Sequence, residues 1–146
     1  MPTVHDATYR AALQSRLRAL KPDSPRRWGK MSPDQMLWHL NVGLSVALGE
    51  TTIPDQRPPL PRPLMKFLVL NLPWVKGAPT SPIFVARSSY DFEGERARCL
   101  QLLGRLASLP LDAPPVMHPI FGRMSGTDTS RLHAKHLDHH LKQFGV

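Results

Sequence analysis

The sequence predicts an all-α protein built as a four-helix bundle, and three observations support this prediction. Apolar residues recur at three- and four-residue spacing in four long stretches, which is typical of amphipathic helices. The 16 prolines fall between these stretches rather than inside them. Alternating strand patterns are nearly absent, because residues 82–86 form the only plausible strand and have no obvious partner. We expect a single helical bundle domain over residues 1–146.

The first helix is predicted over residues 4–20. Tyr9, Leu13 and Leu17 recur at helical spacing, while arginines occupy other positions of the helix. His5 stands at the start of this helix, and we expect its side chain to be exposed to solvent.

The second helix has the clearest start signal in the chain. Ser32 suits the N-cap, Pro33 the first helical position, and Gln35 completes a capping box. The helix should run to about Leu48, and its apolar sequence indicates that most of it is buried. His39 lies on the inward side, where a lone histidine is more often a hydrogen-bonded core residue than a ligand.

The apolar stretch Leu64–Val75 predicts a short helix over residues 64–72 that Pro73 ends. It is too short to span a bilayer. We consider three roles for it, in this order: a lid over a pocket, a dimer contact, or a patch that rests on a membrane surface.

A further long helix is predicted over residues 89–109, with Ser88 or Ser89 as its cap. Cys99 falls on its apolar stripe, so we expect a buried and inert thiol. Because Cys99 is the only cysteine, the sequence excludes an intramolecular disulfide and a cysteine-based zinc site.

The last helix is predicted over residues 125–145. Ser125 and Asp128 can form a capping box, and Gly145 suits the C-terminal end. Gly126 occupies the first helical position, where a proline would be better, so we expect a loose first turn. Four of the seven histidines lie within eight residues of this helix: His133, His136, His139 and His140.

Within the last helix, His136 and His140 lie one turn apart on the face that also carries Leu137 and Phe144. Two neutral imidazoles at this spacing can direct two nitrogens at one metal ion. The alternative is a pair of hydrogen-bonded core or interface histidines. A third ligand from elsewhere would support the metal, and His39 is the best candidate because its helix face is also buried.

The formal net charge of +8 raises the question of anionic partners. The basic residues are scattered, with no long basic run and no interleaved aromatics, so we expect a solvated surface and no nucleic-acid binding. The N-terminal segment does not have the pattern of a secretory signal. We therefore predict a cytoplasmic protein without a transmembrane segment.

Two histidine motifs resemble those of the DinB/YfiT-like superfamily. The first is the Ser-Pro-Asp-Gln-Met-Leu-Trp-His-Leu segment that ends in His39-Leu40. The second is the H-x3-H-x2-Q pattern from His136 to Gln143. Together with the His-Pro-x-Phe-Gly segment that begins at His118 and the C-terminal Gln-Phe-Gly-Val, the sequence looks most like the DUF1569 branch.

This resemblance implies a four-helix bundle, often dimeric, with a divalent metal at one end held by His39, His136 and His140. Members of the superfamily with known activity include thiol-dependent transferases and isomerases, and many others have no assigned reaction. The resemblance thus implies a metal-dependent enzyme with a small-molecule substrate, for which a low-molecular-weight thiol is one candidate. The net positive charge adds an anionic substrate as the other candidate. The alternative is a helical bundle that binds a metal or small ligand without catalysis.

Three imidazole ligands leave at least one coordination position open, which is the pattern of catalytic rather than structural zinc sites. Zn and Ni both accept three imidazoles, and the sequence favours neither over the other. Four further side chains are candidates for supporting roles around the metal: Gln143, His139, His133 and His118.

Overall fold

The computed structural model describes residues 1–146, and the protein is mostly helical. The five α-helices are α1 (Ala7–Ala19), α2 (Pro33–Ala47), α3 (Arg62–Asn71), α4 (Phe92–Ser108) and α5 (Gly126–Gln143). A short 3-10 helix, η1 (Pro82–Phe84), and two antiparallel strands, β1 (Val116–His118) and β2 (Gly122–Met124), complete the secondary structure.

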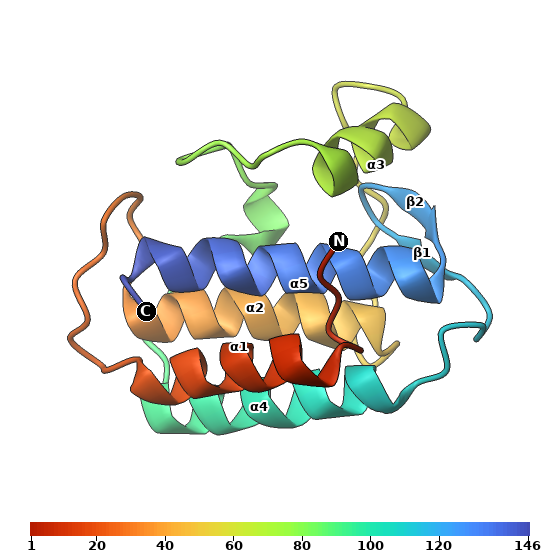
Figure 1. The fold of residues 1–146 in the computed structure, drawn as a ribbon. Coiled ribbons are helices and arrows are strands. Elements are labelled where there is room, and N and C mark those ends of the chain that lie inside the picture. The colour runs from red at the N-terminus through yellow and green to blue at the C-terminus, as the bar shows by residue number, and fades with distance from the viewer.

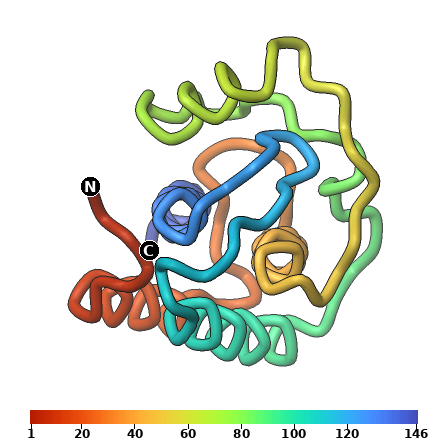
Figure 2. The backbone as a smooth tube through the Cα atoms, turned by 90° about the vertical axis from the view of Figure 1, so that its right-hand side faces the viewer, coloured from red at the N-terminus to blue at the C-terminus, as the bar shows by residue number.

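Helices α1, α2, α4 and α5 lie side by side, and α3 lies on the outer side of α5 (Figure 1). In the end view, α1 and α2 each lie between α4 and α5, so each of these four helices packs against two others (Figure 2). Their inward faces supply most of the main core of 17 buried residues, which includes Leu44, Leu103 and Leu137. Burial of one such leucine stabilises the fold by about 1.5–3 kcal/mol.

The predicted helix starts agree with the structure at the two capping boxes. At α2, Ser32 and Gln35 form the expected reciprocal bonds. At α5, Ser125 and Asp128 do the same. Gly126 follows Ser125 because the backbone of Leu111 packs directly against its α-carbon, and a side chain would collide with the Leu111 carbonyl. This close approach explains why α5 does not begin with a proline.

Two other helices begin later than predicted. Helix α1 begins at Ala7, after Asp6 accepts a hydrogen bond from the backbone N–H of Tyr9. Helix α4 begins at Phe92 rather than after Ser88 or Ser89. The backbone N–H of Tyr90 donates to Asp34 at 2.8 Å, which keeps the preceding segment outside the helix.

Residues 82–86, the only segment with a plausible strand pattern, do not form a strand. Residues Pro82–Phe84 form η1, where the fixed φ of Pro82 suits the first position of a helical turn. The actual strands, β1 and β2, lie in the connector before α5 and were not predicted. Each has only three residues, too few to produce an alternating pattern.

The additional elements are attached to α5 through a second small core. Leu70 of α3, Met124 of β2 and Leu132 of α5 form this cluster. The ammonium group of Lys135 donates to two carbonyls at the end of α3, those of Val69 and Leu72, at 2.7 and 2.8 Å. Helix α3 is therefore held against α5 by both apolar packing and polar contacts.

His5 is partly buried, contrary to the expectation of full exposure. Its Nδ1 lies 2.8 Å from Ser130 Oγ, and its Nε2 lies 2.8 Å from the carbonyl oxygen of Leu109. The imidazole thus connects the N-terminal segment to α5 and to the end of α4. No helix in the structure has the combination of length and apolar character that crossing a membrane requires.

Candidate metal centre

Three histidine rings meet between α2 and α5. His39 comes from α2, and His136 and His140 come from successive turns of α5. The distances between ring centroids are 4.8 Å for His39 and His136, 4.9 Å for His39 and His140, and 4.9 Å for His136 and His140. The three rings therefore form a nearly equilateral triangle, with one ligand nitrogen from each within 4.8 Å of the others.

The spacing of these nitrogens suits a metal ion. Nε2 of His39 lies 2.9 Å from Nε2 of His136. In a tetrahedral zinc site with Zn–N bonds of 2.0–2.1 Å, two ligand nitrogens are about 3.3 Å apart. Small side-chain shifts separate the observed cluster from such an arrangement, so the three histidines could hold a metal ion.

Two of the three rings have their second nitrogen fixed by a hydrogen bond. Nδ1 of His39 lies 2.8 Å from the carbonyl oxygen of Phe84 in η1. Nδ1 of His140 lies 2.8 Å from the amide oxygen of Gln143. Since both oxygens only accept, each Nδ1 carries the hydrogen and each Nε2 keeps a free lone pair. This is the arrangement that metal-binding histidines commonly have.

The surroundings of the cluster keep its histidines neutral. Burial lowers the pKa of His39, with the charge of a protonated His139 as a further cause. Burial also lowers the pKa of His136 well below its usual value, and the neighbouring imidazoles add to this effect. The pKa of His140 falls to about 3, mainly through burial and then through His39. At neutral pH these rings are therefore bases with available lone pairs, as ligands must be.

Aromatic side chains surround the cluster on its outer side. The Trp74 ring lies 5.6 Å from His136 and 5.5 Å from His139 between centroids. The Trp28 ring lies 5.5 Å from His139, and the ammonium of Lys76 lies 4.8 Å from the Trp28 ring centroid. The cluster thus has a partly aromatic cover with one cation at its edge.

The candidates for supporting roles divide into two groups. Gln143 and His139 contact the cluster directly, since His139 lies 5.1 Å from His140 between ring centroids. His133 and His118 instead line a separate small cavity of about 10 Å³. Nδ1 of His118 accepts hydrogen bonds from the backbone N–H groups of the following β-turn, so this residue orders the hairpin.

His133 lies between the histidine cluster and the small cavity that it lines with His118. Its ring centroid is 6.3 Å from that of His136, and burial lowers its pKa to about 3. Its Nδ1 is buried and makes no hydrogen bond with another protein group. His133 is therefore a neighbour of the cluster and is not one of its three meeting rings.

An open groove lies next to η1, beside the turn whose Phe84 carbonyl holds His39. Its volume is about 420 Å³. Arg87 is the one cation in this groove, whose other lining residues are Trp38, Pro82, Ile83, Val85 and Tyr90. The Trp38 and Tyr90 rings are stacked with centroids 5.2 Å apart. The groove combines an apolar wall with a single positive charge.

Three contributors to the site were missed by reasoning from sequence. One is the Phe84 carbonyl, and another is the Trp28 carbonyl, which accepts a hydrogen bond of 2.9 Å from the Gln143 amide. These two carry no sequence signal, because every residue has a carbonyl. Trp74 had a weak signal, as an aromatic residue directly after the Pro73 that ends an apolar helix.

The fold and the cluster together define a mostly helical protein with a largely buried three-histidine site that could hold a metal. The chain matches the family described as "Protein of unknown function (DUF1569)" over residues 6–145, and it belongs to this DUF1569 family. No curated protein matches the chain. No solved structure matches it either.

Proposed function

We propose that this protein is a metal-dependent enzyme whose divalent ion, Zn or Ni, is bound by His39, His136 and His140. The observation that carries the proposal is the convergence of three neutral imidazoles from two helices, two of them oriented by hydrogen bonds that their Nδ1–H groups donate. Nε2 of His136 lies 2.9 Å from Nε2 of His39, and a metal ion held by both rings would replace this direct contact. We further propose that residues 1–146 form a single four-helix bundle domain of the DinB/YfiT-like type.

The protein's own residues would bind and orient the reacting groups. His39 and His140 are held by the Phe84 carbonyl and by Gln143, so their Nε2 atoms stay directed at the cluster. The Trp74 ring packs beside His136, with the two ring centroids 5.6 Å apart. A divalent metal with open coordination positions supplies Lewis acidity, which lowers the pKa of a bound water or thiol. His139 is half-buried beside the cluster and can accept or deliver a proton there.

The resemblance to the DinB/YfiT-like superfamily favours a thiol-dependent transferase or isomerase as the reaction class. The substrate we propose is a small molecule that is anionic or a low-molecular-weight thiol. Lys76 at the edge of the aromatic cover and Arg87 in the neighbouring groove support an anionic group. A homodimer is part of the same proposal and rests on the resemblance alone.

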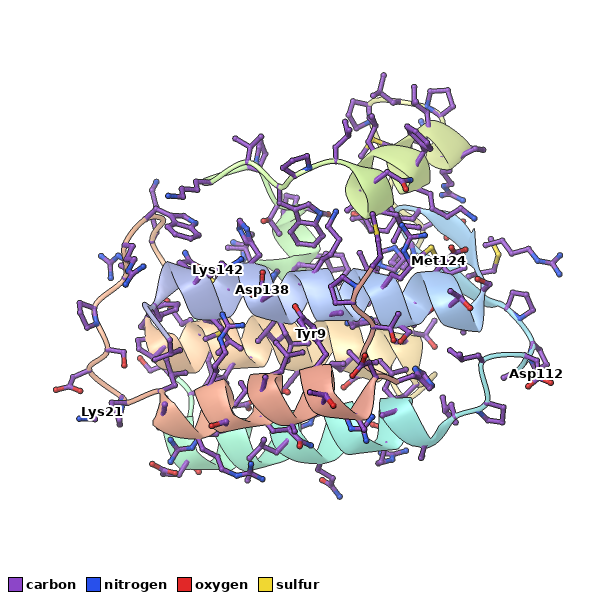
Figure 3. The ribbon with its side chains drawn as sticks, in the orientation of Figure 1. Tyr9, Lys21, Asp112, Met124, Asp138 and Lys142 are labelled. Atoms are coloured by element: carbon purple, nitrogen blue, oxygen red, sulfur yellow. The ribbon has the colours of Figure 1, made fainter.

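One observation favours the alternative, a bundle that binds a metal or small ligand without catalysis. The cluster contains no free carboxylate that could serve as a general base. Asp138 lies between the two cluster histidines of α5 in sequence, but it pairs with Arg16 at 2.8 Å and with Lys142 at 2.7 Å (Figure 3). Proton transfer would therefore depend on His139 or on the substrate.

The first experiment is to measure the metal content of a tag-free preparation by mass spectrometry. The parent is compared with His39→Ala and with His136→Ala/His140→Ala, and His5→Gln serves as a control outside the cluster. We expect nearly one metal per chain in the parent and in His5→Gln, and almost none in the other two. A parent that stays metal-free after reconstitution with Zn or Ni would refute the proposal.

The second experiment separates the enzyme from the alternative. The metal-loaded parent is assayed with a panel of low-molecular-weight thiols and electrophiles, using the metal-free His39→Ala variant as the blank. Turnover in the parent alone supports the enzyme. Full metal occupancy without turnover across the panel favours the binding protein.

A further inference from the structure

The outward side of α3 and the segments next to it is unusually apolar for a surface. Five of the eleven large hydrophobic side chains that are exposed in the whole protein lie within residues 60–75: Leu60, Leu64, Phe67, Leu72 and Val75. We call these five residues the α3 surface. Leu70, which packs on α5, is buried, whereas the five side chains of the α3 surface are exposed. The apolar character of the α3 surface is therefore not needed for the fold.

Charge is distributed unevenly around the α3 surface. Residues 56–90 contain no aspartate or glutamate and carry five cations: Arg57, Arg62, Lys66, Lys76 and Arg87. Arg62 pairs with Asp55 at 3.4 Å, and Lys66 pairs with Asp128 at 3.3 Å. The other three form no ion pair in the structure, and all three are exposed. The chain segment that carries the exposed apolar side chains therefore also carries exposed positive charges without an ion-pair partner.

We propose that the α3 surface rests on an anionic phospholipid membrane. An amphipathic helix with apolar residues on one side and Lys or Arg beside them lies in the plane of a membrane interface, where anionic headgroups attract the cations. Phe67, with 57% of its surface exposed, is the central apolar residue of α3 itself. The contact is peripheral, because no helix of this chain could cross the bilayer.

The charge pattern favours a membrane over a second copy of the chain. In a symmetric dimer the same patch faces itself, so Arg57 and Lys76 would approach cations of the partner copy. An anionic lipid surface neutralises the same cations. Figure 1 shows α3 and the segment after it on the side of α5 that faces away from α1 and α4.

The docking segment also belongs to the cover of the histidine cluster. Trp74 lies between Leu72 and Val75 of the α3 surface, and its ring packs against His136. The proposal itself depends only on the exposed side chains, so it stands whether or not the cluster binds metal.

The test is co-sedimentation of the full chain with two kinds of vesicle at low salt. One kind is phosphatidylcholine alone, and the other contains about 30 mol% phosphatidylserine. We expect partitioning onto the anionic vesicles to exceed that onto the neutral ones by about tenfold or more, and to fall as salt is raised. The variant Leu64→Ser/Phe67→Ser should lose about tenfold of this binding, and Arg57→Gln/Lys76→Gln should lose a similar amount.

The control variant is Leu109→Ser/Leu111→Ser, which removes two leucines of similar exposure after α4. Leu109 and Leu111 are 41% and 44% exposed, against 43% for Leu64. This control should bind like the parent, and circular dichroism should show unchanged helix content in all variants. Equal binding by the control and by Leu64→Ser/Phe67→Ser would overturn the proposal, because net charge alone would then explain the attraction. A parent dimer that Leu64→Ser/Phe67→Ser converts to monomer would also overturn it, in favour of a second copy.

Discussion

The amide oxygen of Gln143 lies 2.8 Å from Nδ1 of His140, one turn earlier on α5. The amide nitrogen of the same side chain donates to the carbonyl of Trp28 at 2.9 Å. Gly29 follows with a φ of 78°, and a side chain there would collide with the Gln143 amide. The connector before α2 therefore fixes the Gln143 amide, and this amide orients the His140 ring.

We expect Gln143→Leu to weaken metal binding by about 10- to 100-fold, the usual cost of losing a hydrogen-bond partner of a ligand. Leucine keeps much of the side-chain volume but can accept no hydrogen bond from His140. The measurement is competition with a chromogenic chelator, for Zn and for Ni separately.

Gln143→Glu is the matched control, because it keeps the acceptor for His140 but loses the donor to the Trp28 carbonyl. We expect metal affinity within a few-fold of the parent, together with a lower free energy of unfolding from the lost bond. If both variants lose affinity equally, the orientation of His140 does not depend on the Gln143 oxygen.

Gly43 of α2 faces the rings of His133 and His136, and a methyl group there would lie 3.5 and 3.7 Å from them, which is ordinary contact. We expect Gly43→Ala to keep full metal affinity and to raise the free energy of unfolding by about 0.5–1 kcal/mol. Gly43→Leu should displace the rings and reduce metal content. Thermal melts and metal analysis of both variants provide the measurements. Parental affinity in Gly43→Leu would contradict this account of the packing.

Cys99 should be unreactive while the protein is folded. It is fully buried, and burial, followed by the charge of Glu95, raises the pKa of its thiol to about 12. The reactive thiolate is therefore nearly absent at neutral pH. We expect no reaction with an aromatic disulfide reagent in buffer and one thiol per chain in denaturant. Fast labelling of the native protein would show that α4 opens locally.

The histidine cluster could be predicted from sequence because helical periodicity determines which side chains share a face. His136 and His140 lie on one face of any helix that contains them, and His39 occupies the buried face of a helix with a clear capping box. The meeting of these two faces depends only on the packing of two amphipathic helices.

The remaining parts of the site could not be predicted, for a different physical reason. The Phe84 and Trp28 carbonyls reach His39 and Gln143 from connectors, and connector paths are determined by tertiary contacts rather than by local pattern. The hairpin of β1 and β2 could not be predicted for the same reason. The pairing of two three-residue strands depends on the turn and on packing against α5. The solvent exposure of His5 was predicted wrongly, because its hydrogen-bond partner Ser130 is distant in sequence.

The capping box of α5 predicts a specific dependence of stability on pH. Burial would raise the pKa of Asp128, but hydrogen bonds from Ser125 and the charge of Lys66 outweigh this effect and lower it below 3.8. The unfolded chain therefore takes up the proton at a higher pH than the folded protein does. The stabilisation is complete above the unfolded pKa and is lost as pH falls through the folded one. We expect Asp128→Asn to lower the free energy of unfolding by about 1 kcal/mol at pH 7. Below about pH 4, the free energy of unfolding of this variant should fall less steeply with pH than that of the parent.

Asp112→Asn is the matched control for this prediction. Asp112 is an exposed carboxylate in the connector after α4, and it forms no hydrogen bond or ion pair (Figure 3). Urea unfolding of the metal-free parent and both variants between about pH 3 and pH 7 gives the free energy of unfolding at each pH. The difference between parent and Asp128→Asn should shrink toward the acid end, while Asp112→Asn should follow the parent throughout. A difference that stays constant with pH would mean that Asp128 stabilises α5 through its shape and not through its charge.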